Sequence, residues 1–425
     1  MPLLTGGSSP GQGGNRVRVP TGTRTARSDN ARAGAPPPLD RSEGDTVCRG
    51  MHRIVRWVTL ALCCTLVGAT AGSAEDYLAR LRETLAQTGA DLPRLSHSAE
   101  RAAAAFAHGG TLWVTGRQAD FITEACGRAG GLMASTPLGQ RSPGRSDIVL
   151  EAVPGQLTGD EAHRSAEWQT QGVVVVTFAS RAGLFQGRCP VDSVANIAAL
   201  WAWTGEFVAA STRRGRMPVL YQSYGLPGGI DWAKKYQGKK FHDDLTITPI
   251  ASGVLGKAYL EQLDGMLATL ERTQGPKLRQ AAAWWRDASK GSSLTLFTGH
   301  MFPRHAQDSR APTFSALAEA PPEVKPGWTL PTDSPAFLLY LGYQFAPAPL
   351  LSQLEGTATK VVYCTVRPVQ PPEPATNICY LDPGWPVTDA CVTVPGYAIA
   401  ILPASGVVQA AIYWTLVAER AWSAP

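Results

Sequence analysis

The sequence predicts an α/β protein of two lobes, each built on a doubly wound parallel sheet of the flavodoxin type. Three observations predict this fold. The chain has 425 residues, of which 44% are hydrophobic and 17% charged, so it is long enough for two domains with sizeable cores. Short apolar runs alternate with stretches of helical period, and this pattern restarts after residue 250. The Val-rich run 173–178 is typical of a parallel strand that is covered on both faces.

The first 74 residues predict a leader. Residues 1–50 are rich in Gly, Pro, Ser, Thr and Arg without a hydrophobic period, so we expect a disordered segment or an extension upstream of a true start at Met51. Residues 51–74 combine a basic start, an apolar run and small residues, the pattern of a signal peptide. The apolar run is too short for a comfortable span, so we expect export to the periplasm or outside the cell, with no stable membrane span after cleavage. An anchor formed by the uncleaved segment is the alternative.

The net charge of +5 lies entirely in this leader. It holds nine arginines, no lysine and four acidic residues, and the rest of the chain has equal numbers of basic and acidic residues. A neutral body offers no basic surface for a polyanion, so nucleic acid is not an expected partner.

Cysteine and histidine spacing argues against a metal site. The five cysteines after the leader include no CxxC pair, and neither the pair His300 and His305 nor the run 242–244 has a third ligand at a recognisable spacing. We therefore expect no metal and no other cofactor. Cys364 with Cys379 or Cys391 could form a disulfide, and buried thiols are the alternative.

The first lobe is expected over residues 75–250. Leu78, Leu81 and Leu85 recur at helical spacing at its start, Gly116 ends its first strand, and a Gly- and Lys-containing connection occupies 223–250. Its predicted elements are helix 75–108, strand 111–115, helix 121–133, strand 148–153, helix 158–170, strand 173–178, helix 192–213 and strand 217–222.

The second lobe is expected over residues 251–425. Gly299 ends its first strand, a Pro-rich excursion occupies 303–335, and Ser405 is a suitable cap for an amphipathic closing helix. Its predicted elements are helices 256–271 and 277–288, strands 294–298, 337–341, 360–366, 377–381 and 390–394, and helix 405–422.

A weak internal repeat links the two lobes. In both, an Ala-rich helix precedes a strand that ends in Thr-Gly and is followed by a cation, at 101–117 and again at 279–300.

This arrangement resembles the sugar isomerase (SIS) domain family, whose members often carry two such lobes. Residues 109–116 are similar to the family's first strand with its terminal glycine, and 124–132 (Glu-Ala-Cys-Gly-Arg-Ala-Gly-Gly-Leu) to a helix of one branch. Residues 389–396 and the helix from Ser405 resemble the family's last strand and closing helix. The resemblance implies a small-molecule carbohydrate derivative as the ligand.

One feature of the family is missing. Its members usually hold phosphate in a loop rich in Ser and Thr, whose hydroxyls and backbone N–H groups suit an anion. The matching stretch 154–160 keeps one hydroxyl and adds Asp160, and 342–347 has only the phenol of Tyr343. A phosphate loop is therefore not evident in either lobe, and we expect a neutral, sugar-like ligand.

Ligands of open α/β sheets bind beyond the carboxyl ends of the strands. We expect that edge to display polar side chains from both lobes, in a cleft between the lobes or at a strand edge. Those of the first lobe are Arg117, Gln118, Gln156, Thr158, Ser180 and Arg181, and those of the second are His300, Arg304, His305, Tyr343 and Gln344.

Catalysis of an aldose–ketose type would need a base and a ring-opening acid. Glu124 is the candidate base and His300 the candidate acid. The alternatives are a Glu124 that pairs with Arg128 four residues on, and a His300 satisfied by backbone groups.

Two function classes follow, with a third kept open. The first is a sugar or amino-sugar binding protein that lacks turnover, and the second is a phosphosugar isomerase-like enzyme that uses Glu124. The third is a structural exported homodimer. Tryptophans at 201, 203, 284 and 285 are expected in the core or in a dimer interface.

Overall fold

The computed structural model describes residues 74–288, 292–298, 308–311, 314–366 and 376–422. Residues 70–425 belong to one compact unit, which contains both sheets. The predicted signal peptide, the extension before it, and the second lobe's His300, Arg304 and His305 lie outside the described residues. Export therefore stays a prediction, as do the lobe boundaries and the sequence repeat.

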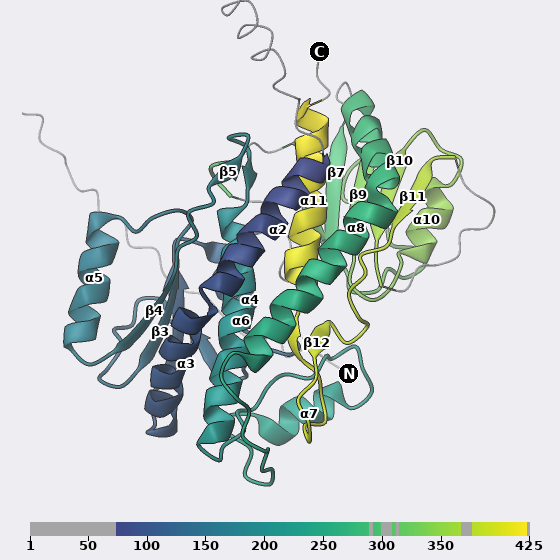
Figure 1. The fold of residues 1–425 in the computed structure, drawn as a ribbon. Helices are drawn as coiled ribbons and strands as arrows, with labels where there is room; N and C mark the ends of the chain where they lie inside the picture. The colour runs from purple at the N-terminus through teal and green to yellow at the C-terminus, as the bar shows by residue number, and fades with distance from the viewer. Residues whose placement is uncertain (1–73, 289–291, 299–307, 312–313, 367–375, 423–425) are drawn as a thin grey trace, which may run out of the picture. The chain divides into compact units, whose positions relative to one another are not determined.

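The first sheet contains β1 (Leu112–Gly116), β2 (Ser135–Pro137), β3 (Ile148–Ala152) and β4 (Val174–Phe178) in the order β2-β1-β3-β4. All of its strand pairs are parallel. Figure 1 shows α5 (Gly159–Thr170) on one side of this sheet and α3 (Leu92–Ala107) on the other. Leu150 lies in the main core, while its neighbour Glu151 is bound by Ser165 and Arg164 of α5 at 2.5 and 2.7 Å.

The second sheet repeats this order and adds a fifth strand. It contains β7 (Ser293–Thr298), β8 (Ala316–Ala320), β9 (Phe337–Leu341), β10 (Lys360–Cys364) and β11 (Ile378–Leu381) in the order β11-β10-β9-β7-β8, all parallel. Leucines of α10 (Ala348–Leu354) pack on one face, and Trp285 of α8 (Val254–Asp287) stacks on Phe337 on the other. When the strands of each sheet are numbered in chain order, the first four strands of both sheets follow the flavodoxin order 2-1-3-4. This order confirms the predicted fold class.

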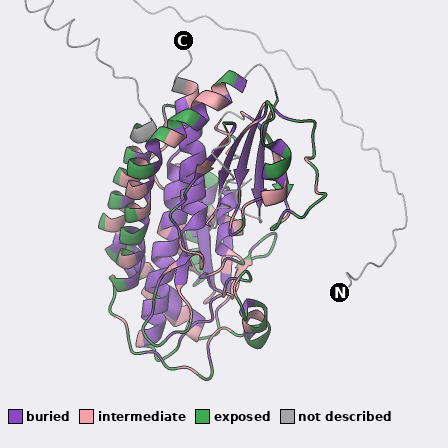
Figure 2. Cartoon of the chain, turned by 90° about the vertical axis from the view of Figure 1, so that its right-hand side faces the viewer, coloured by how far each residue is buried: buried purple, intermediate pink, exposed green. Residues whose placement is uncertain are grey.

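Two buried helices occupy the centre of the described unit. In α6 (Asp192–Arg213) and α11 (Ser405–Trp422) nearly every described residue is buried, as the purple ribbons of Figure 2 show. They contact each other, and α2 (Ala74–Ala90) and α8 pack against both. A helix that is buried all round needs apolar or internally bonded side chains on every face. The expected amphipathic character of the closing helix is therefore wrong, because elements on all sides cover it.

Several predicted boundaries differ from the structure. The helix expected over 75–108 is broken at Asp91, after which α3 begins with a proline in its first turn. The helix expected over 121–133 is only α4 (Ala119–Ala125), because Gly127 and Gly130 take positive φ values. Conversely, the two helices expected over 256–288 are one continuous α8, which tolerates Pro276 inside it.

The remaining differences concern short elements. Residues 217–222 form isolated bridges rather than a strand, and β8 lies within the Pro-rich excursion. Helices α7 (Gly229–Tyr236) and α10 were not expected. The predicted strand 390–394 is β12 (Ala390–Val392), which pairs antiparallel with β13 (Ile401–Pro403) outside the main sheet, and a second small pair joins β5 (Leu184–Phe185) to β6 (Cys189–Pro190).

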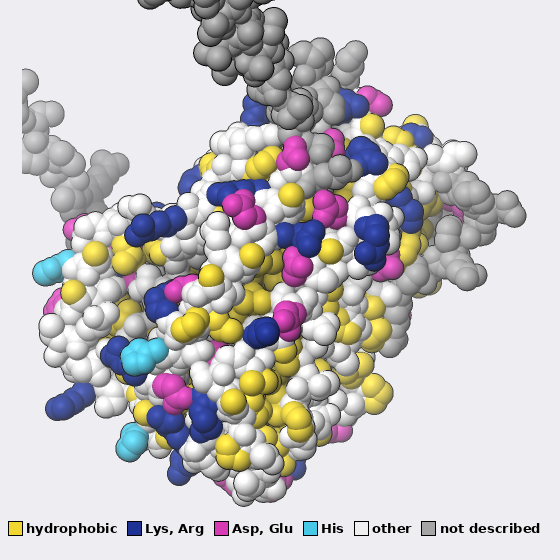
Figure 3. All heavy atoms as spheres, viewed as in Figure 1, with side chains coloured by type: hydrophobic (Ala, Val, Ile, Leu, Met, Phe, Trp, Pro, Cys, Tyr) yellow, Lys and Arg dark blue, Asp and Glu magenta, His cyan; other side chains and the backbone are white. Residues whose placement is uncertain are grey.

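The surface of the described unit carries both signs of charge. On the face shown in Figure 3, basic and acidic side chains are interspersed. Partly exposed ion pairs such as Arg82 with Asp264 also occur. None of the described helices has the length and apolar character needed to cross a membrane.

Candidate functional site

A pocket of about 370 Å³ lies where both lobes meet, at the carboxyl end of the second sheet. The strand order reverses between β7 and β9, and such switch points are where open α/β sheets bind ligands. Thr298 ends β7, and Tyr343 and Gln344 follow β9. The lining is completed by Gly127, Arg128, Ala129, Tyr221, Gln222, Ser223, Tyr224, Gly225, Pro322, Phe345 and Asp389.

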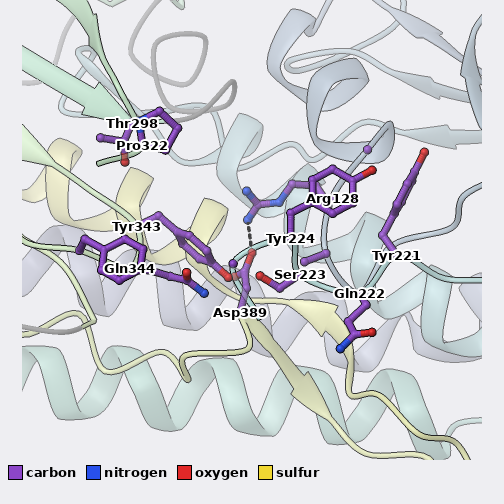
Figure 4. A pocket seen from close by; sticks show the side chains of 14 residues that line it. Arg128, Tyr221, Gln222, Ser223, Tyr224, Thr298, Pro322, Tyr343, Gln344 and Asp389 are labelled. Atoms are coloured by element: carbon purple, nitrogen blue, oxygen red, sulfur yellow. Dashed lines mark ion pairs between the residues drawn. The ribbon is translucent and has the colours of Figure 1, made fainter. Parts of the chain in front are cut away.

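The polar floor of the pocket is a buried ion pair between the lobes. Arg128 follows α4 and places Nη2 at 2.9 Å from Asp389 Oδ2, with both side chains almost fully buried (Figure 4). The same Nη2 donates to Ser405 Oγ at 2.6 Å, and the Ser405 backbone N–H donates to Asp389 Oδ1 at 2.9 Å. Arg128 is therefore fixed by groups at the N-terminus of α11 and before β12.

Asp389 is held in an unusual backbone conformation. Its φ is 64°, in the left-handed region that non-glycine residues rarely adopt. Its carbonyl accepts the Ala404 N–H at 3.1 Å, and its carboxylate accepts the Ser405 N–H. Strained residues of this kind persist where the surroundings over-determine them, often at ligand sites.

Glu124, the predicted base, lies behind this pair rather than in the pocket lining. Its Oε1 is 3.6 Å from Arg128 Nε and accepts a hydrogen bond from Trp201 Nε1 at 3.2 Å. The side chain is fully buried and packs against Gly406, where a Cβ would collide with its carboxylate. The structure thus contains the Glu124–Arg128 pair that the sequence offered as an alternative to a catalytic role.

The charges at the floor compensate each other. Burial raises the pKa of Asp389 above its ordinary value, although the Arg128 guanidinium opposes this. Burial also disfavours the charge on Arg128, but the carboxylates of Asp389 and Glu124 outweigh it and raise the pKa of Arg128. One guanidinium facing two carboxyl groups leaves no excess positive charge for an anionic ligand.

The pocket walls combine aromatic rings with neutral hydrogen-bonding groups. Tyr221, Tyr224, Tyr343 and Phe345 supply the rings, and burial raises the pKa of Tyr343, which keeps its hydroxyl protonated. Figure 4 shows the side chains of Tyr343, Ser223 and Asp389 converging below Arg128, with Thr298 across the space.

Two further polar side chains have distinct roles in the wall. The buried Gln344 donates through Nε2 to the Val387 carbonyl at 3.2 Å and abuts Gly225, where any Cβ would collide with it. Thr298 Oγ1 is buried and makes no hydrogen bond within the described residues.

The corresponding end of the first sheet is filled by its own side chains. Gln118 donates through Nε2 to the Ser193 carbonyl at 2.8 Å, and its Oε1 accepts from Asn196 Nδ2 at 2.8 Å. Asn196 also donates to the Val153 carbonyl at 2.9 Å and accepts the Ser180 N–H at 2.8 Å. The hydrogen bonds of these groups are made with one another and with the backbone. The switch point of the first sheet therefore offers a ligand little free hydrogen-bonding capacity.

An arginine from the second lobe covers this region. Arg310 donates to both carboxylate oxygens of the buried Asp192 at 2.7 and 2.8 Å. It also pairs with Asp308 at 2.6 Å, and Ser193 Oγ donates to the same carboxylate at 3.1 Å. A bidentate guanidinium–carboxylate pair is the most directional ion pair in proteins, so Arg310 ties the second lobe to the start of α6.

The remaining first-lobe candidates serve local structure. Thr158 is the N-cap of α5 and forms a reciprocal capping box with Glu161. Arg117 donates to Glu161 at 2.7 Å and to the Gln156 carbonyl at 2.9 Å. Arg181 lies with Ser180 at a separate, smaller hollow beside α2 and α3.

Of the predicted site residues described by the structure, Gln344 and Tyr343 lie in the second-lobe pocket, and Glu124 lies behind its floor. The other first-lobe candidates lie at the filled edge, with Ser180 and Arg181 also at the separate hollow. The sequence reasoning missed Arg128, Asp389 and the 221–225 segment as pocket residues. Arg128 and Asp389 both stood in the motifs that carried the family resemblance, and that coincidence was the available signal.

The described cysteines are thiols that do not pair with one another. All five described cysteines are free, and burial raises the pKa of Cys126 and Cys391 to about 12, which keeps them as thiols. No group of three or more His, Cys, Asp or Glu side chains in the described part of the chain could hold a metal ion.

No family model and no curated protein matches the sequence. Solved structures are similar in fold. The C-terminal domain of glucosamine-fructose-6-phosphate aminotransferase from Francisella tularensis has a TM-score of 0.45 and 12% identity, over 82% of this chain and 97% of that one. A proposed sugar binding protein from Salmonella typhimurium LT2 has a TM-score of 0.42 and 12% identity, over 81% and 98%. A proposed phosphosugar isomerase from Silicibacter pomeroyi has 0.40 and 15%, over 80% and 97%. The fold itself is established by the strand order described above.

Proposed function

We propose that the protein binds a carbohydrate derivative, a sugar or amino sugar, in the pocket at the second switch point. The observation that carries the proposal is the composition of the lining: aromatic rings and neutral hydrogen-bonding groups around an arginine whose charge Asp389 compensates. The ligand class is the one that the resemblance to the SIS family implies. Sugars present apolar C–H faces beside hydroxyl groups, and mostly apolar pockets with a few placed polar groups suit such ligands.

The same lining disfavours a phosphorylated ligand. Phosphate sites use unpaired cations or several free N–H groups at a helix N-terminus. Here Arg128 already bonds Asp389 and Ser405, and the Ser405 N–H is already taken by Asp389. A phosphate would have to compete with a carboxylate that is fixed in the floor.

Thermal shift and calorimetric titration of the full chain test this proposal. The ligand set is neutral sugars, amino sugars and their 6-phosphates. We expect a neutral or amino sugar to stabilise the protein, and its 6-phosphate to bind more weakly. Tyr343→Ala should abolish the shift, whereas Arg117→Ala at the filled edge should leave it unchanged. Absence of any hit across the set contradicts the proposal.

The second candidate is an isomerase that uses Glu124 as its base. Its support is that Glu124 is 3.6 Å from Arg128, which does line the pocket. Conversion of an aldose phosphate to the ketose by the wild type, lost in Glu124→Gln, would favour this function. Undiminished turnover in Glu124→Gln would exclude Glu124 as the base.

An exported location completes the proposal and rests on the sequence pattern of residues 51–74. Mass spectrometry of the mature chain from a fractionated host tests it. A mature N-terminus near residue 75 in the exported fraction is expected, and a full-length chain in the membrane fraction would favour the uncleaved anchor.

A further inference from the structure

Exposed apolar side chains gather at the mouth of the pocket. The large hydrophobic side chains that are exposed within the described residues are Tyr224 (61%), Ile230 (57%), Val254 (49%) and Phe345 (38%). Two of these side chains, Tyr224 and Phe345, line the pocket. Exposed apolar groups that cluster in this way commonly mark a binding surface.

The two exposed rings belong to segments that meet at the pocket wall. The end of the Gln344 side chain lies against Gly225 and would have to move if position 225 carried a Cβ. Tyr224 and Phe345 precede and follow these two contacting residues in the chain, and both line the pocket. Tyr224 also meets Tyr221 edge to face, with ring centroids 6.5 Å apart.

The pocket itself is small. Its volume of about 370 Å³ is near the lower end of the roughly 300–1,000 Å³ that ligand pockets span. A small ligand unit would fill it and contact the pocket side of Tyr224, a residue that is 61% exposed and so also reaches beyond the pocket. The rings at the rim therefore remain available to parts of a ligand that extend outside.

We propose that the ligand is an oligosaccharide, with its terminal sugar in the pocket and the following units stacked on Tyr224 and Phe345. This inference rests on the proposed carbohydrate function. Successive sugar units carry repeated apolar faces, which two exposed rings at the pocket can bind. A protein partner is disfavoured, because a stable interface needs about 800 Å² on each side with an apolar core, and among the described residues that line the pocket the exposed large hydrophobic side chains are Tyr224 and Phe345.

Titration calorimetry on the full chain with two pairs of probes tests the inference: N-acetylglucosamine with its β-1,4-linked tetramer, and glucose with maltotetraose. We expect one tetramer to bind at least roughly tenfold more tightly than its monomer. Tyr224→Ala and Phe345→Ala should each weaken tetramer binding by roughly two- to tenfold more than they weaken monomer binding, because both rings line the pocket and also extend beyond it. Val254→Ala is the matched control, since Val254 is similarly exposed but does not line the pocket.

The outcomes separate the inference from the function on which it rests. Equal affinity for monomer and tetramer overturns the oligosaccharide proposal and leaves sugar binding standing. Binding of neither pair, nor of any other sugar in the thermal-shift set, overturns both. Sedimentation of the ligand-free chain provides the other test: a dimer that Tyr224→Ala dissociates would show that the rim is a protein interface, and would overturn the inference.

Discussion

At the carboxyl end of the first sheet, Gln118, Asn196 and Ser180 bind one another and the backbone, and Arg310 covers the adjacent Asp192. At the same end of the second sheet, with the same strand order, the last residue of β7 and the residues after β9 line a pocket. A shared topology therefore does not give a shared site. The side chains that follow the strands decide whether the switch point is filled by the protein or left for a ligand.

The two ends also differ in how they use arginine. Arg128 is almost fully buried, and its partners Asp389 and Glu124 are buried as well. Arg310 keeps about a third of its side chain exposed while it pairs with a fully buried Asp192. Removing either arginine leaves a buried carboxylate without its cation. Water reaches the edge at Arg310 more easily than the floor at Arg128, so the loss in the free energy of unfolding should be smaller for Arg310.

The largest expected effect is that of Arg128→Met. It leaves two buried carboxyl groups without their cation, and we expect a loss of about 3–5 kcal/mol in the free energy of unfolding. Urea denaturation of the full chain measures it. Arg117→Met is the control, because Arg117 is about half exposed and its partner Glu161 keeps the hydrogen bond from the Thr158 N–H, so the loss should be less than about 1 kcal/mol. Equal losses for the two variants would remove the distinction between a buried floor and an exposed pair.

Arg310→Met should have the next largest effect, about 1–3 kcal/mol, because solvent replaces part of what the partly exposed guanidinium provides to Asp192. The same unfolding experiment measures the loss. In calorimetry the variant should still bind one equivalent of sugar with unchanged affinity. A second equivalent bound after this substitution would show that Arg310 merely blocks a working site in the first lobe.

Acid titration should give opposite trends for the two edges. Burial opposes ionisation of Asp308, but hydrogen bonds from Arg310 prevail and lower its pKa below the ordinary 3.8. Its stabilising contribution is therefore present above pH 3.8 and is lost as the pH falls through the lower folded-state value. Burial raises the pKa of Asp389 above 3.8, so the folded state binds that proton more tightly, and stability decreases as the pH rises from 3.8 through the folded-state value.

Unfolding free energies of the wild type, Asp308→Asn and Asp389→Asn between pH 3 and 7 test these signs. The advantage of the wild type over Asp308→Asn should shrink toward the acid end, and its advantage over Asp389→Asn should grow there. Asn is a fair replacement at position 389, because it tolerates the left-handed backbone found there. Parallel trends for both variants would contradict the contrast between the two edges.

The sequence was most informative for the strands and least so for the pocket. β7, β9 and β10 are short apolar runs bounded by Gly, Pro or polar residues, and such local patterns can be recognised in one sequence. The pocket floor joins Arg128 to Ser405, 277 residues apart, and no local period encodes that contact. Likewise, the residues of α11 show a helical period, but the elements that bury its remaining faces come from other parts of the chain.

The smallest effect, and the one that probes the open switch point most directly, is that of Thr298→Val. Valine keeps the shape of threonine and removes an Oγ1 that is buried at the end of β7 and makes no hydrogen bond among the described residues. Stability should stay the same or rise slightly, since a buried polar group is removed. Sugar affinity should fall by roughly two- to tenfold, as for one lost hydrogen bond of about 0.5–1.5 kcal/mol.

Thr295→Val is the control for Thr298→Val, because Thr295 lies in the same strand, fully buried, and its hydroxyl bonds Ser315 at 2.7 Å. That variant should lose stability and keep its sugar affinity, the reverse of the Thr298 result. If Thr298→Val binds sugar as the wild type does, the ligand does not reach β7, and the site contracts to the wall formed by Arg128, Tyr343 and the 221–225 segment. Of the strands of the second sheet, only β9 would then contribute to the site, through the residues that follow it, and the switch point would be used less than the strand order indicates.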